Sequence, residues 1–148
     1  MESGGTVKGN TTVSDKRETV SGNGKPHCRL DAWKEAMQLV KLVYEMTLLF
    51  PHEERLGLAQ QMRRAAVSVP SNIAEGAARS GKREFANFIS IARGSLSELH
   101  TQCLIAVELG YLPQDHATLA SVERVSKLLT GLYQRLTGGV KKRSGGSQ

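Results

Sequence analysis

Histidine and glutamate are the residues whose spacing could build a metal centre in this sequence, and their spacing does not fit one. Helical bundles that bind two metal ions use Glu-x-x-His pairs, because residues three apart share a helix face. None of the eleven glutamates is followed three residues later by histidine, and the HExxH pair of zinc proteases is also missing. The sequence therefore indicates no metal site and no cofactor.

Other catalytic arrangements leave no signal in the sequence either. It contains no Gly-rich phosphate-binding loop and no GxSxG turn, and its two cysteines, Cys28 and Cys103, form no CxxC pair. Cys103 falls in an apolar helical stripe, where a reduced cysteine acts as a small core residue. We therefore expect a protein that is not an enzyme, although a triad assembled only in space would be invisible in the sequence.

Basic residues are the remaining candidates for binding chemistry. The net charge is +6, but residues 1–29 hold five Lys/Arg against three acids, and residues 137–148 hold three against none. Between these ends, the segment 63–93 carries six basic residues against two glutamates. Within it, Arg79, Lys82 and Arg83 are the predicted contacts to the phosphates of RNA or DNA. Aromatic residues are not interleaved with them, which argues against base stacking, and solvated helix ends are the alternative.

Amphipathic helices must position these residues. Apolar side chains at spacings of three and four predict helices over about residues 31–50, 52–78, 82–109 and 119–136. Asp31 is the expected N-cap of the first helix. Pro70 lies inside the second, where we expect a kink rather than a break. Four such helices with short links predict an all-α, antiparallel up-and-down four-helix bundle.

Both ends of the chain are polar, and their apolar residues do not recur at helical or strand spacing. We expect a disordered polar arm over residues 1–29, the bundle over 30–136, and a flexible basic tail over 137–148 that carries Lys141, Lys142 and Arg143. The first 29 residues hold no apolar signal-peptide core, and no stretch approaches the ~20 apolar residues of a membrane span. We therefore expect a cytoplasmic protein without membrane contact.

A second ordered face runs beside the apolar stripe of the second and third helices. Small residues cluster along it, which permits the close approach of another backbone. A hydrated face with alanines chosen for helix propensity is the alternative. Its polar members, at spacings of three and four, are Gln61, Arg64, Ser68, Asn72 and Glu75, then Asn87, Gly94 or Ser95, Glu98 and Gln102.

Several runs of sequence are distinctive as a set. They are FPHEERLGL from Phe50, QMRRAAVSVPSNIAEG from Gln61, ARGSLSEL from Ala92 and GYL from Gly110. Together with Trp33, over about residues 30–136, they resemble the four-helix-bundle family named after proteins encoded in the intervening sequences of 23S ribosomal RNA genes. The resemblance implies a closed ring, a homopentamer, and contact with RNA or a ribonucleoprotein. A related branch is the accessory variability determinant, which assists retroelement reverse transcriptases.

The resemblance also singles out residues of the polar face. We expect them to form a subunit interface or a buried polar network, in which Glu75 and Glu98 would pair with Arg64 and Arg93. Two functions remain open: an oligomer that binds nucleic acid, or an adaptor ring that docks a partner enzyme. Carried over by position, the family motif covers Arg63, Arg64, Ser68, Asn72, Glu75, Arg93, Ser95 and Glu98.

Overall fold

Helices make up the body of the protein. The computed structural model describes the backbone of residues 25–146, while the side chains of Cys28, Arg29 and residues 139–146 lie outside the description, as does most of the predicted N-terminal arm. The described part is all-α and contains no strand, as predicted. Its elements are η1 (Pro26–Arg29), α2 (Asp31–Thr47), η2 (His52–Glu54), α3 (Leu58–Ala77), α4 (Lys82–Glu108) and α5 (Ala117–Gly146).

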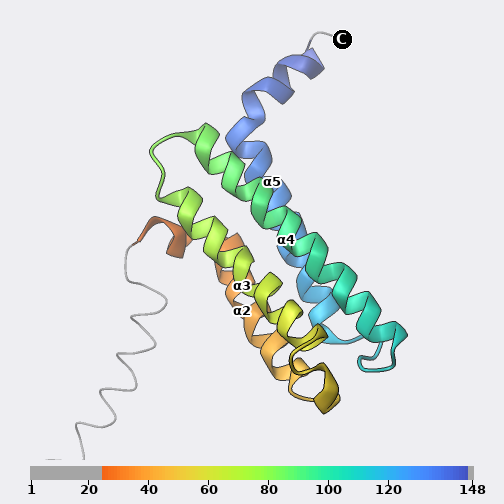
Figure 1. The fold of residues 1–148 in the computed structure, drawn as a ribbon. Helices are drawn as coiled ribbons and strands as arrows, with labels where there is room; N and C mark the ends of the chain where they lie inside the picture. Colours follow the sequence, from red (N-terminus) through yellow and green to blue (C-terminus); the bar gives the residue numbers. More distant parts are fainter. Residues whose placement is uncertain (1–24, 147–148) are drawn as a thin grey trace, which may run out of the picture.

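The four long helices form a bundle in which each helix has two neighbours. Consecutive helices pack against each other, and α5 returns to pack on α2, which closes the bundle (Figure 1). Short links force each helix to run back along the one before, so the predicted four-helix bundle is confirmed. The largest fully buried apolar side chains come from all four helices: Leu39, Val43, Met62, Val69, Ile73, Ile89, Leu99, Val125 and Leu129.

The first helix differs from its prediction at both ends. Leu30, not Asp31, occupies the N-cap position. Asp31 lies in the first turn, where its carboxylate interacts favourably with the positive end of the helix dipole. The helix ends at Thr47 rather than Phe50. Beyond it, Leu49 N–H donates to the Met46 carbonyl and Phe50 N–H to the Thr47 carbonyl, a tighter turn that brings the Phe50 ring into the core.

The second predicted helix begins later than the sequence suggested. His52–Glu54 forms a separate 3-10 turn, and α3 starts at Leu58, after Gly57. Glu54 Oε1 accepts a hydrogen bond from Leu58 N–H at 3.1 Å, which satisfies one of the free donors at the start of α3. From there α3 continues as one helix through the buried Pro70, so it does not break there, and the kink stays a prediction.

The link between α4 and α5 begins with a left-handed glycine. Gly110 has φ +81, a conformation that only glycine adopts without strain, and its N–H donates to the Val107 carbonyl. Tyr111 N–H reaches back to the Ala106 carbonyl at 2.9 Å, which completes a Schellman motif and fixes the position of Tyr111. The glycine predicted to end this helix therefore does so.

The last helix is longer than expected. It runs to Gly146, beyond the predicted boundary at residue 136, so its helical backbone includes most of the predicted tail. The side chains of Lys141, Lys142 and Arg143 lie outside the described residues, and the flexibility of the tail stays a prediction. Within the described part of the chain, no helix is long and apolar enough to cross a membrane.

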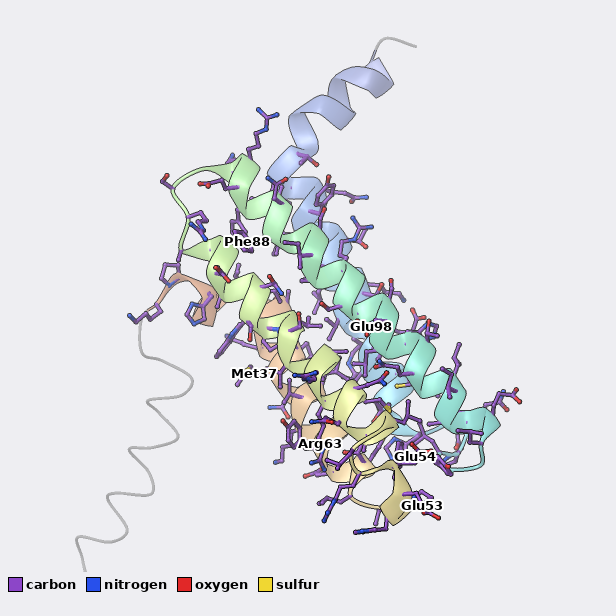
Figure 2. The ribbon with its side chains drawn as sticks, in the orientation of Figure 1. Met37, Glu53, Glu54, Arg63, Phe88 and Glu98 are labelled. Atoms are coloured by element: carbon purple, nitrogen blue, oxygen red, sulfur yellow. The ribbon has the colours of Figure 1, made fainter. Side chains whose placement is uncertain are left out.

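A glycine sets the distance between α3 and α4. A Cβ placed on Gly76 would lie 2.7 Å from Phe88 Cβ and 2.9 Å from Phe85 Cδ1, both closer than real Cβ atoms come. Figure 2 shows Phe88 where the two helices approach each other at this end of the bundle. Any side chain at position 76 would therefore push the helices apart.

We expect Gly76→Ala to destabilise the protein by about 1–3 kcal/mol, because overpacking outweighs the gain in helix propensity. Urea unfolding followed by circular dichroism measures the change. Gly131→Ala in α5 is the matched control, since its added Cβ would meet only the Arg135 guanidinium at 3.7 Å. That variant should be as stable as the parent or more so. A Gly76→Ala protein with undiminished stability would show that the helices separate freely.

Candidate nucleic-acid interface and the surrounding surfaces

The three predicted phosphate-binding residues lie together at the turn between α3 and α4. Lys82 and Arg83 are exposed in the first turn of α4, and Arg79 is exposed just after α3. We call this turn the basic end. Arg79 is held in place, because its Nη2 pairs with Glu75 Oε2 at 3.2 Å and its guanidinium lies 4.9 Å from the centre of the Phe88 ring. Figure 1 shows that the last turns of α5 extend from this same end of the bundle.

The charges at the basic end favour an anion. The acids beside the three cations are Glu75, which is bound to Arg79, and Glu84 in the first turn of α4. The positive end of the α4 dipole lies at Lys82 and adds to their field. A phosphate group could therefore contact the exposed cations of this turn directly from solvent.

The predicted polar face divides into two kinds of residue. Ser68 of α3 and Ser95 of α4 are hydrogen-bonded through their hydroxyl oxygens at 2.8 Å, and Asn72 Nδ2 donates to both the hydroxyl and the carbonyl of Ser68, at 3.0 and 2.8 Å. These three residues therefore form a partly buried network that joins the two helices. They belong to the packing of the bundle itself.

The charged members of that face do not form the predicted pairs within the described chain. Glu75 pairs with Arg79 instead of Arg64, and Arg93 lies over the Tyr133 ring at 5.1 Å instead of meeting Glu98. All four predicted partners are exposed. A charge in water needs no buried partner, so the buried-network hypothesis fails for these residues, and the interface hypothesis stays a prediction.

Arg63 has a structural role that the sequence did not reveal. Its Nε donates to Thr47 Oγ1 at 2.8 Å, its Nη2 donates to the Tyr44 carbonyl at 3.3 Å, and the guanidinium lies 4.5 Å from the centre of the Tyr44 ring. The cation thus satisfies free acceptors at the negative end of the α2 dipole. Arg63 therefore ties α3 to α2.

Two side surfaces of the bundle are apolar and exposed. The outer face of α4 presents Ile91 and Ile105, which expose 52% and 43% of their surface, with Gly94 and Glu98 between them. On another side, α2 and α3 line an open groove of about 380 Å³. The groove is lined by Trp33, Met37, Val40, Val67, Pro70, Ser71 and Ala74.

The opposite end of the bundle carries exposed leucines that the periodicity of the helices did not predict. Leu48, Leu49 and Leu56 lie in the link between α2 and α3, and Leu109 follows α4. We call these four residues the leucine end. A possible sequence signal is the run Leu48-Leu49-Phe50, in which apolar residues are consecutive and so cannot all face one core.

The described residues hold neither an activated thiol nor a metal-binding cluster. Cys103 is fully buried, and burial raises the pKa of its thiol to about 11, so it holds almost no thiolate near neutral pH. No group of three or more His, Cys, Asp or Glu residues able to hold a metal occurs in that part of the chain. The basic end, the two side surfaces and the leucine end are therefore the candidate functional surfaces.

Comparison with known families gives a match over most of the bundle. The model of the 23S rRNA-intervening sequence protein family matches residues 29–131, which is well over half of the chain. The match includes the basic end, the polar face and the leucine end. A comparison with curated proteins finds no match.

We expect Arg63→Ala to destabilise the protein by about 1–2 kcal/mol, since it removes two hydrogen bonds from a charged donor. The neighbouring Arg64→Ala is the control: Arg64 is exposed, and its loss should change stability by less than about 0.5 kcal/mol. Thermal and urea unfolding of both variants measure the difference. Equal stability of the two proteins would contradict the role assigned to Arg63.

Proposed function

We propose that this chain, which belongs to the family of 23S rRNA-intervening sequence proteins, binds nucleic acid as an assembly of identical subunits and catalyses no reaction. The family's description names a gene context rather than an activity, so the function has to be argued from the surface. The observation that carries the proposal is the basic end, where Arg79, Lys82 and Arg83 come together on one turn. The cytoplasm remains the expected location.

Contacts at the basic end would be made to phosphates rather than to bases. Lys82 and Arg83 offer charged donors in water, and the Phe88 ring near them is covered by the Arg79 guanidinium. No exposed aromatic ring lies on this turn for a base to stack on. Binding of RNA or DNA should therefore depend on charge and show little sequence preference.

Assembly would supply the affinity that one subunit lacks. Three cations release few counterions, but a ring repeats them and brings several phosphates into contact at once. The outer face of α4 and the α2–α3 groove are two different apolar surfaces, and two surfaces that fit each other generate a head-to-tail ring when the rotation closes. The homopentamer implied by the family resemblance is such a ring.

Charge complementarity supports pairing these two surfaces. The outer face of α4 carries the exposed Glu98, whereas Lys41 and Arg64 lie exposed on α2 and α3, the helices that form the groove. Apolar side chains would be buried between them, and opposite charges would meet at the rim. This arrangement gives the charged members of the polar face a role at a subunit interface.

The nucleic-acid proposal predicts that changing Arg79, Lys82 and Arg83 together to Ala weakens binding by about tenfold or more, because each subunit of the ring loses its phosphate contacts. Mobility shifts with duplex DNA and structured RNA at two salt concentrations measure it. The logarithm of the binding constant should fall linearly with the logarithm of the salt concentration, with a slope of ~0.9 for each duplex phosphate contacted. The variant should show a shallower slope.

A charge-matched variant separates this site from a general effect of net charge. Arg55 is exposed on the link before α3, and Arg124 and Lys127 are exposed on α5. Changing all three to Ala removes the same charge and should preserve most of the binding. Equal losses in the two triple variants, or no binding by the parent protein at low salt, would rule out the basic end as the site.

The assembly proposal predicts that Ile91→Glu and Val67→Glu each give smaller particles, because each places a charge in one half of the interface. Light scattering at micromolar concentration measures the mass. Mixing the two variants should restore dimers, since one intact pair of surfaces remains. Ala120→Glu, at an exposed position of α5, is the control and should keep the parent mass. A monomeric parent protein would contradict the ring.

A further inference from the structure

The leucine end has no part in the proposed nucleic-acid binding. Leu48, Leu49 and Leu56 expose 74%, 84% and 78% of their surface, and Leu109 exposes 53%. Single exposed leucines are ordinary in soluble proteins. Four of them on two short links at one end of a bundle are a concentration of apolar surface that typically marks an interaction site.

The two links are fixed against each other, so this surface exists before a partner arrives. The Phe50 and Tyr111 rings pack with centres 5.3 Å apart, and Tyr111 Oη donates to Glu54 Oε2 at 3.0 Å. That hydrogen bond is the main cause of the raised pKa of the Tyr111 hydroxyl. Figure 1 shows both links at the end of the bundle away from the basic end. A preformed surface lowers the entropy cost of docking.

A hollow beside the leucines provides a place for side chains of a partner. It measures about 330 Å³, and its lining includes the apolar Leu48, Phe50 and Pro51 together with Arg55 and Arg63. An exposed apolar knob next to a recess is the shape in which a helix or loop of another protein can interdigitate.

The charge around this end indicates which surface would fit it. Residues 44–59 and 104–116 hold five acidic residues against one arginine, Arg55, and a second arginine, Arg63, reaches this end from α3. Glu53 is labelled at this end in Figure 2, and like Glu45, Glu108 and Asp115 it is exposed. An apolar surface with an acidic rim is complementary to an apolar surface with a basic rim.

One apolar surface of this chain with cations beside it, the α2–α3 groove near Lys41 and Arg64, is paired with the outer face of α4 in the proposed ring. The N-terminal arm and the turn of the basic end do not offer another. Residues 1–24 contain no Leu, Ile, Phe, Tyr or Trp, so the N-terminal arm has little apolar surface to cover the leucines. The basic end carries the right charge, but residues 78–90 include none of the exposed large apolar side chains. A second copy stacked end to end would therefore leave the leucines in water.

We infer that the leucine end docks a different protein, through an amphipathic segment whose leucine-like side chains are flanked by lysine or arginine. The inference goes beyond the proposed nucleic-acid binding, because it uses the other end of the bundle. One subunit could therefore hold nucleic acid at one end and a protein at the other.

A labelled helical peptide of about 18 residues, composed of leucine and lysine with one apolar face, is the probe. Fluorescence anisotropy gives its Kd for the full-length protein. Changing Leu48, Leu49 and Leu56 together to Ser should weaken binding about tenfold or more, whereas Leu104→Ser on α4, outside the two surfaces assigned to the ring, should leave it within about twofold. All four side chains are exposed in the subunit, so circular dichroism should report unchanged helix content in both variants.

The acidic rim is tested separately. Changing Glu53 and Glu108 to Gln and Asp115 to Asn should weaken binding of the peptide and make its affinity less dependent on salt. A leucine–glutamate peptide should bind the parent protein more weakly than the leucine–lysine peptide does. Glu54 is left intact because it bonds to Tyr111. The Arg79, Lys82 and Arg83 variant should bind the peptide as the parent does, so failure of this inference and failure of nucleic-acid binding are distinguishable.

Three results would overturn the inference. They are a parent protein that does not bind the peptide, a leucine variant that binds it undiminished, and a leucine variant whose particles are smaller than those of the parent. The last result would assign the leucine end to a contact between copies of this chain.

Discussion

The close approach of α3 and α4 is the constraint on which the rest of the structure depends. It is possible because Gly76 has no side chain to meet Phe88, and it continues along the helices at the Ser68–Ser95 hydrogen bond. Small side chains let two backbones approach closely, and two polar side chains buried in the contact can then hydrogen-bond to each other. Once these two helices are locked, the short turn between them has little freedom. The cations of the basic end are therefore held on a rigid base.

The opposite end is fixed by a different kind of interaction. Gly110 turns the chain at the end of α4 and places Tyr111, whose ring packs on Phe50 and whose hydroxyl reaches Glu54. The other carboxylate oxygen of Glu54 accepts a hydrogen bond from the first turn of α3. One carboxylate thus joins the start of a helix to a link that lies far away in the sequence. The link between α2 and α3 is held in one conformation by polar contacts and Phe50, while its leucines remain outside.

How far the sequence can predict this structure depends on whether a signal is local. Four helices follow from apolar periodicity, and the end of α4 follows from Gly110, because both signals lie within the element that they describe. The start of α3 does not follow from the sequence in this way. Residues 52–54 have the composition of a helix start, but the structure begins α3 only after Gly57. The packing of Tyr111 against Phe50 was equally beyond reach, because only the folded chain brings these residues together.

The polar face shows the same limit for a functional site. Spacings of three and four place residues on one side of a helix, yet that side is broad enough to include both the seam between two helices and the open surface. Ser68 and Asn72 therefore fall in the seam, while Arg64 and Glu75 fall in water. Arg63 is adjacent in sequence to Arg64 and points to α2 instead. Residue types could suggest pairs, but the partner of each charge was set by which neighbouring helix it faced.

The topology of the bundle separates the charges of the chain along its axis. Antiparallel helices send alternate links to opposite ends, so cations between α3 and α4 and acids in the two other links cannot neutralise one another. Water screens charges beyond ~10 Å at ordinary ionic strength, which makes each end respond to its own residues rather than to the net charge of the protein. The value of +6 for the whole chain therefore describes neither end. A substitution at the basic end should alter attraction for anions without changing the acidic rim around the leucines.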